Sequence, residues 1–129
     1  MRAQVAPVLD EVVSGRGDVD QLLIGKSLGT HAAALAAERQ LPAVWLTPLL
    51  ILEPVVAALR AATRPFLLVG GTADPAWDGK LARELSPHVL EVVDADHGMQ
   101  VPGPLANSAA VLGQVATAVE DFLDRVVWS

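Results

Sequence analysis

Leu22-Leu23-Ile24-Gly25-Lys26-Ser27-Leu28-Gly29 is a short apolar run followed at once by the pattern G-x-S-x-G. We expect the apolar run to be a buried strand and the alanine-rich stretch 28–40 to be a helix. The two glycines permit the sharp turn that such a strand-to-helix junction requires among crowded neighbouring strands. This turn would expose the Ser27 hydroxyl at the end of the sheet, beside the N-terminal N–H groups of the helix.

A second interpretation uses the same letters, because Gly25-Lys26-Ser27 matches the end of a phosphate-binding P-loop, G-x-x-x-x-G-K-[ST]. That motif needs a glycine five positions before Gly25, where this chain has Asp20. It also needs a glycine-rich loop between strand and helix, whereas here the apolar run continues directly into Gly25. The sequence therefore favours the turn centred on the serine.

Two kinds of apolar segment alternate along the chain, and this alternation is typical of a parallel sheet covered by helices. Helical spacing of apolar residues predicts an N-terminal amphipathic helix over residues 5–13. The expected strands are 22–24, 43–46, 66–69 and 89–93. The expected helices that follow them are 28–40, 54–62, a segment with Trp77, Leu81 and Leu85 on one face, and a last helix capped by Asn107. We predict one α/β domain over residues 1–129, a three-layer sandwich with a short parallel sheet of about four strands.

An acid and a histidine follow two of the later strands. Asp74 comes after strand 66–69 by a glycine turn, and His97 comes after strand 89–93 by a short loop. Because the carboxyl ends of parallel strands share one edge, we expect Ser27, Asp74 and His97 to meet there. A serine nucleophile needs a base, and that base needs an orienting acid. Taken singly, Asp74 before a proline also suits a turn or helix cap, and His97 also suits an exposed loop.

Three stretches, with this chain order of serine, acid and histidine, resemble the α/β hydrolases, namely residues 22–30, 69–75 and 94–99. The chain is similar to the small, cap-less esterases of the dienelactone-hydrolase type. The resemblance implies that Ser27 is the nucleophile, His97 the general base and acid, and Asp74 its orienting partner. It further implies that the backbone N–H of Leu28 is one oxyanion-hole donor. The expected activity is hydrolysis of small carboxylic esters or thioesters through an acyl-enzyme.

The chain departs from that family before its serine turn. The family has several strands and a loop there, and the loop carries the second oxyanion donor, for which no residue of this chain can be assigned. The family topology would leave strand 22–24 with a bare edge, through which we expect a homodimer or another partner to pair. Two alternatives stay open, namely a truncated or non-catalytic hydrolase-like protein and an acyltransferase that uses the same serine.

Right-handed crossovers would place the helices after the first three strands on one face of the sheet. The other face would be left mainly to the last helix, so we expect an exposed apolar patch there. Strand 89–93 is interrupted by Glu91, which suits an edge strand protected by charge.

Other residues near the expected site are less strongly indicated as catalytic or substrate-binding residues. Asp78 falls inside an expected helix, and Asp94 and Asp96 are too close in sequence to His97 to hold its ring, so we expect Asp96 to cap the turn. The side chains expected to flank the site and contact substrate are Lys26, Trp45, Trp77 and Met99. Core packing is an equally good role for the last three, and a solvated position is the common role of a lysine.

The composition limits the classes of function. The 129 residues carry a formal net charge of −6, are 52% hydrophobic and include no cysteine. An acidic chain without a basic cluster does not suit nucleic acid or an anionic membrane surface as partner. The lack of cysteine excludes disulfides and zinc–thiolate sites, and no metal or dinucleotide motif is present, so we expect no cofactor. No signal-peptide pattern or uninterrupted membrane span is found, and we expect a cytoplasmic protein.

Overall fold

The computed structural model describes residues 9–14, 21–26 and 30–128, with side chains from residue 34 onward. In this part of the chain, five strands form one sheet in the order β1-β2-β3-β4-β5. The strands are Leu9–Ser14 (β1), Gln21–Lys26 (β2), Ala43–Leu46 (β3), Phe66–Gly71 (β4) and His88–Val92 (β5). Strands β2 to β5 are parallel, whereas β1 is antiparallel to β2. The sheet is open, and β1 and β5 form its two edges.

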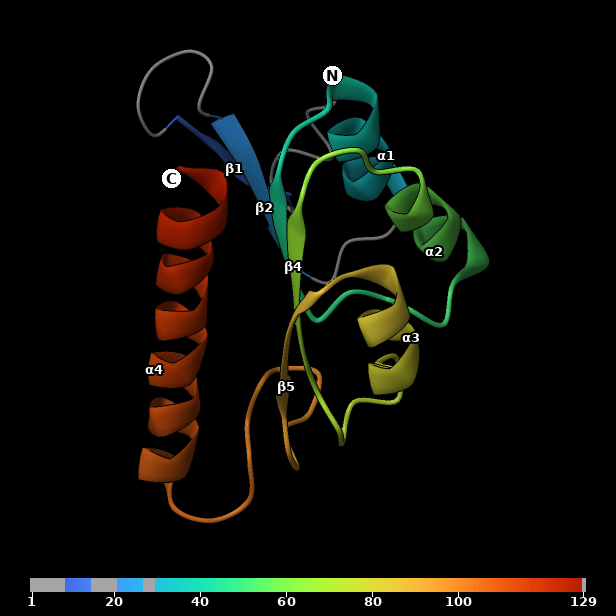
Figure 1. The fold of residues 1–129 in the computed structure, drawn as a ribbon. Helices are drawn as coiled ribbons and strands as arrows, with labels where there is room; N and C mark the ends of the chain where they lie inside the picture. Colours follow the sequence, from blue (N-terminus) through green and yellow to red (C-terminus); the bar gives the residue numbers. More distant parts are fainter. Residues whose placement is uncertain (1–8, 15–20, 27–29, 129) are drawn as a thin grey trace.

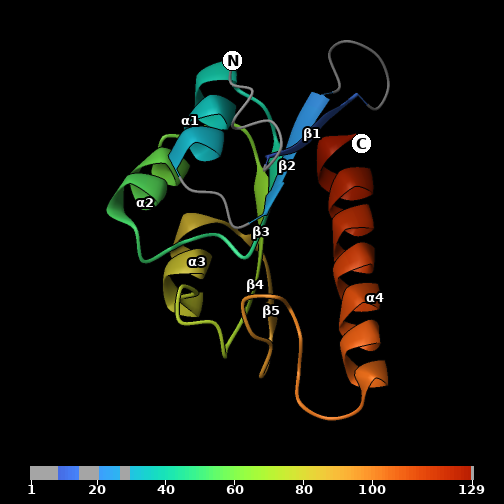
Figure 2. The ribbon, with the colours of Figure 1, turned by 180° about the vertical axis from the view of Figure 1, so that it is seen from behind.

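Helices lie on both faces of the sheet, which confirms the prediction of an α/β fold. They are α1 (Thr30–Arg39), α2 (Glu53–Arg60), α3 (Gly79–Leu85) and α4 (Leu105–Phe122), and Leu123–Val127 continue α4 as a π-helical turn. Figures 1 and 2 show α1, α2 and α3 on one face and α4 on the other. Among the helices described, none has both the length and the hydrophobicity needed to cross a bilayer.

Each face of the sheet has its own apolar cluster. Under α1, α2 and α3 the buried side chains include Trp45, Leu50, Val55, Leu59, Leu68 and Trp77. Under α4 they include Val44, Leu67, Val69, Val92, Val111 and Phe122. Strand β4 is buried along its whole length, as expected of a strand covered on both faces. The aliphatic runs of the sequence therefore form strands because both of their faces leave water.

Residues 9–14 form a strand, so the prediction of a helix over residues 5–13 is wrong for this part. Val12 and Val13 lie opposite Leu23 and Leu22 of β2. A helix of about nine residues is marginal on its own, whereas a strand beside β2 gains ladder hydrogen bonds. Adjacent β-branched residues such as Val12 and Val13 also fit a pleated sheet well.

This pairing corrects the expectation that strand 22–24 has a bare edge. Strand β1 covers that side of β2. A homodimer or other partner therefore cannot add a strand to β2 without displacing β1. The partner predicted for the edge at Leu22-Leu23-Ile24 is accordingly withdrawn.

The start of α4 also differs from the prediction. The helix begins at Leu105 with Pro104 as its N-cap, three residues earlier than a cap at Asn107 would allow. The Asn107 side chain instead donates from Nδ2 to the Pro102 carbonyl at 3.3 Å. Ser108 makes a second contact with the loop before the helix, because its Oγ accepts a hydrogen bond from the Val101 N–H at 3.0 Å. The two side chains hold the incoming loop against the first turn of the helix.

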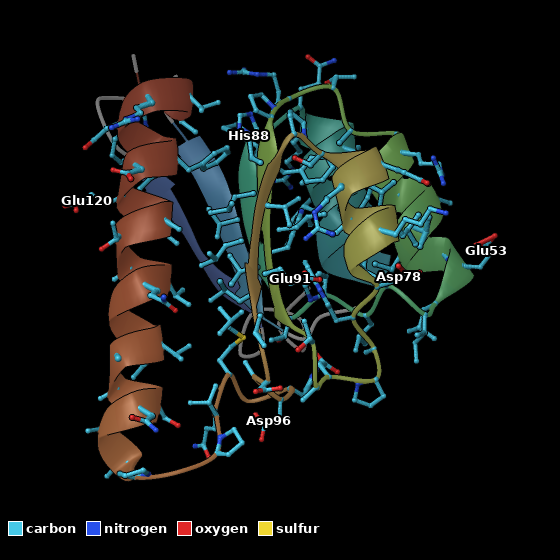
Figure 3. All side chains as sticks on the ribbon, turned by 60° about the horizontal axis from the view of Figure 1, so that its bottom comes forward. Glu53, Asp78, His88, Glu91, Asp96 and Glu120 are labelled. Atoms are coloured by element: carbon cyan, nitrogen blue, oxygen red, sulfur yellow. The ribbon has the colours of Figure 1, made fainter. Side chains whose placement is uncertain are left out.

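Glu91 joins the edge strand β5 to α3 (Figure 3). Its Oε2 accepts a hydrogen bond from Trp77 Nε1, and its Oε1 accepts one from Arg83 Nη2, both at 2.8 Å. Strand β5 lies at the sheet edge as the sequence predicts, and the charged side chain of Glu91 binds Arg83 of the neighbouring helix α3. The hydrogen bond from Trp77 is the main cause that lowers the pKa of Glu91 below 4.5, the bond from Arg83 adds to it, and desolvation opposes both.

This lowered pKa predicts a pH dependence of stability. Because the pKa of Glu91 is lower in the folded chain, ionised Glu91 stabilises the fold above pH 4.5, and this contribution is lost as the pH falls further. We expect Glu91→Gln to flatten the fall in melting temperature between roughly pH 5 and pH 3. Thermal unfolding followed by circular dichroism measures this fall. Glu84→Gln, at an exposed glutamate of α3, is the control; equal curves for both variants would contradict the role of Glu91.

Candidate active site

Asp74 and His97 meet at the C-terminal edge of the sheet. Asp74 lies in the loop after β4, and His97 lies in the loop after β5. The Nδ1 atom of His97 is 2.7 Å from Oδ2 of Asp74. The Asp74 side chain is 1% exposed, whereas the His97 side chain is 42% exposed. The carboxylate is thus enclosed by protein, while the imidazole ring reaches the surface.

Both oxygens of the Asp74 carboxylate have a partner. Oδ1 accepts a hydrogen bond from the Ala76 N–H at 2.9 Å, which closes a turn within the loop. The Asp74 N–H donates to the Gly71 carbonyl, and the Asp74 carbonyl accepts from the Trp77 N–H. The turn fixes the carboxylate, and its second oxygen is thereby aimed at His97. The turn role and the pairing role that the sequence left open are therefore both fulfilled by the same residue.

The loop that carries His97 is held by the residue before it. Oδ1 of Asp96 accepts hydrogen bonds from the N–H groups of Gly98 and Gln100, each at 2.9 Å. The Asp96 N–H donates to the Gln100 carbonyl, and its own carbonyl accepts from the Met99 N–H. This confirms the prediction that Asp96 caps the turn, at the lower end of the sheet in Figure 3. His97 is thus presented on a closed turn.

Backbone contacts join the Asp74 loop to the His97 loop. The Ala73 N–H donates to the Ala95 carbonyl at 2.9 Å, and the Thr72 N–H donates to the Val92 carbonyl at 3.0 Å. Thr72 Oγ1 in turn accepts from the Asp94 N–H at 2.7 Å. These bonds set the separation of the two loops, and hence the distance between the carboxylate and the ring.

Gly71 allows this close approach. A Cβ atom built on Gly71 would lie 2.2 Å from the carbonyl oxygen of Ala95, which is backbone and cannot swing away. Glycine is therefore required by space at this position. Gly71, which the sequence predicts as part of a turn, thus also allows the two loops to pack together.

The predicted nucleophile lies outside the described residues. Ser27 and Leu28 are not among the described residues, and neither is the side chain of Lys26. Strand β2 ends at Lys26 and α1 begins at Thr30, which agrees with the strand and helix predicted on either side of the serine turn. Because β2, β3 and β4 run parallel, β2 ends at the same sheet edge from which the Asp74 loop leaves.

Three side chains that were expected to flank the site lie in the apolar core. Trp45 and Trp77 are 5% and 8% exposed in the cluster under α1, α2 and α3. Met99 is 6% exposed in the cluster under α4. These large apolar side chains gain more by leaving water than a surface pocket would permit. Of the two roles that the sequence left open for these residues, core packing is observed, and a contact with substrate stays a prediction. Asp78 caps α3 through a hydrogen bond from the Leu81 N–H.

The loop after β3 is bonded to the Asp74 loop. Thr47 is fully buried with a φ of 49°, and its N–H donates to the Val69 carbonyl at 2.7 Å. The Leu50 N–H donates to the Ala76 carbonyl at 3.0 Å. A threonine before a proline, directly after an apolar strand, was the available signal for such a turn.

Two apolar side chains of this loop remain in water. Ile51 is 66% exposed and Leu52 is 42% exposed. They directly follow Leu50, whose N–H contacts the loop that holds the acid. Large apolar groups exposed in a loop that is bonded to the Asp74 loop are suited to contact a small organic molecule.

Within the described residues, no group of three or more histidine, aspartate or glutamate side chains is arranged to hold a metal ion. Comparisons of the chain with protein families, with curated proteins and with solved structures found no match.

Proposed function

We propose that this protein is a serine hydrolase of small carboxylic esters or thioesters, built on the C-terminal part of an α/β-hydrolase-type sheet. The observation that carries the proposal is the 2.7 Å contact between the buried Asp74 carboxylate and Nδ1 of the half-exposed His97. This pair lies at the sheet edge where β2 ends and the G-x-S-x-G sequence follows. In the proposal Ser27 is the nucleophile, and the Leu28 N–H helps to hold the oxyanion.

The chemistry follows from the pair. An ionised carboxylate can only accept hydrogen bonds, so Nδ1 of His97 carries the hydrogen and donates it to Asp74. The neutral ring then has its lone pair on Nε2, which takes the proton from the Ser27 hydroxyl as that oxygen attacks the ester carbonyl. The ring becomes an imidazolium beside the buried carboxylate, whose charge stabilises it. His97 next gives the proton to the leaving alcohol or thiol, and the acyl-enzyme is then hydrolysed by water in the same way.

The surroundings of the pair favour small or open substrates. The half-exposed imidazole implies access from solvent, and the loop after β3 is short and bonded to the Asp74 loop. Ile51 and Leu52 offer an exposed apolar contact for the acyl or alcohol part of an ester.

A fluorophosphonate tests the proposal, because it reacts covalently with an activated serine. We expect intact-mass spectrometry of the purified chain to show a single adduct, and we expect Ser27→Ala to show none. Circular dichroism of both proteins shows that each is folded.

The outcome also separates the proposed hydrolase from its alternatives. No adduct on folded wild-type protein would refute the hydrolase and support a non-catalytic chain. An adduct that persists in Ser27→Ala would assign the reaction to another residue. If labelling is as expected, product analysis with and without an added alcohol distinguishes water from another acyl acceptor.

A further inference from the structure

Helix α4 has two apolar faces, and one of them packs on the sheet. Residues at intervals of four, three and four turn toward the cluster formed with β3, β4 and β5, namely Val111, Val115, Ala118 and Phe122. Val111 is 6% exposed and Phe122 is 4% exposed. This face accounts for the attachment of the helix to its own sheet.

The other apolar face lies in water. It consists of Leu105, Ala109, Leu112 and Ala116, which we call the outer seam, and all four are exposed. Leu105 is 83% exposed and Leu112 is 65% exposed. The intervals of four, three and four average about 3.7 residues, close to the 3.6 residues of one helical turn, so the four side chains lie along one side of the helix. This exposed apolar surface lies on the helix itself and is distinct from the uncovered sheet face on which the sequence predicts a patch.

The helix around the outer seam lacks the charges of an ordinary surface helix. No charged residue occurs from Leu105 to Val119, over fifteen consecutive positions. A helix that faces water normally carries charged side chains opposite its buried stripe. Figures 1 and 2 show that the side of α4 away from the sheet faces outward. The sequence of α4 is thus that of a helix covered on two sides.

We propose that a second copy of this chain covers the outer seam, with the two α4 helices antiparallel around a twofold axis. In this register Leu105 lies opposite the partner's Ala116, and Ala109 lies opposite the partner's Leu112. The twofold axis repeats both contacts, so every leucine meets an alanine and the surface is complementary to itself, as a symmetric dimer requires. Large side chains facing small ones let two helices approach closely along their length.

Charge favours the antiparallel arrangement. The first turn of α4 contains no acidic residue, whereas the end of the helix carries Glu120 and Asp121. Glu120 is exposed and is directed away from the sheet in Figure 3. In the proposed register it lies next to the N-terminus of the partner's helix, where a carboxylate is stabilised by the helix dipole. Parallel helices would instead bring the acidic ends of the two copies together.

Sedimentation equilibrium of the full chain tests the dimer. An interface centred on one helix is small, so we expect a dissociation constant on the order of micromolar. Leu112→Lys should raise that constant at least about tenfold, because a charge then faces the partner's Ala109. Thr117→Lys adds the same charge at an exposed position of α4 outside the seam, and it should leave the constant unchanged.

Cysteine cross-linking tests the register, because the natural chain has no cysteine. A mixture of Leu105→Cys and Ala116→Cys chains should form a mixed disulfide rapidly on oxidation. Leu105→Cys alone should not cross-link, since its two copies would be about 16 Å apart along the helices. A wild-type chain that stays monomeric at hundred-micromolar concentration overturns the proposal, as does a dimer that Leu112→Lys leaves intact. Efficient cross-linking of Leu105→Cys with itself overturns the antiparallel register.

Discussion

Asp74→Asn is expected to lower the rate of ester hydrolysis about ten-thousandfold while the protein stays folded. The asparagine keeps an oxygen that can accept the Ala76 N–H, so the turn that fixes position 74 is preserved. Its amide group, however, would donate a hydrogen bond to Nδ1 of His97. The ring would then carry its hydrogen on Nε2 and could no longer take the proton of Ser27. Hydrolysis of a nitrophenyl ester, followed with saturating substrate, measures the loss.

Asp78→Asn is the matched control for that experiment. Asp78 is also an aspartate whose oxygen accepts a backbone N–H, in this case that of Leu81 at the start of α3. Its replacement changes the same charge without touching His97, so we expect hydrolysis to change by no more than a few-fold. The ¹⁵N resonances of the His97 ring give a second measurement, because they report which nitrogen carries the hydrogen. Wild-type activity and an unchanged tautomer in Asp74→Asn would contradict the assignment of Asp74.

The central strands and the loops of the site can be predicted from the sequence because their signals are local. A run of apolar residues that ends in Gly70-Gly71 predicts β4 and the turn after it. Parallel order then places Asp74 and His97 at one edge, and their 2.7 Å contact is observed. The hydrogen bonds that hold the two loops together involve Thr72, Ala73 and Ala95, whose letters carry no pattern, so the sequence alone does not reveal them.

The errors arise where a distant contact decides the structure. Residues 9–14 show helical spacing, but pairing with β2 makes them a strand. For Trp45 and Trp77 the sequence left two roles open, substrate contact and core packing, and both side chains are enclosed by the helices on that face of the sheet. In each case the pattern of apolar and polar residues is compatible with two structures. Contacts with residues distant in the sequence determine which of the two forms.

Gly71→Ala is expected to destabilise the fold by about 2 kcal/mol or more, because the added methyl group would overlap backbone. The Cβ would lie 2.2 Å from the Ala95 oxygen and 2.6 Å from its carbonyl carbon. To relieve this overlap the β5 loop must move away from the β4 loop. The hydrogen bond from Ala73 to Ala95 would then lengthen, and Asp74 would separate from His97. Urea unfolding measures the stability, and fluorophosphonate labelling measures the separation through a slower reaction.

Gly113→Ala makes the same chemical change where there is room for it. A Cβ on Gly113 would meet nothing within 4 Å, and the residue lies inside α4. Alanine is the better helix former, so this variant should gain about 0.5–1 kcal/mol and label at the wild-type rate. One added methyl group is therefore expected to lower the stability of the fold at position 71 and to raise it at position 113. If Gly71→Ala were as stable as the wild type, the approach of the two loops would not depend on glycine, and the positioning of the Asp74–His97 pair would need another cause.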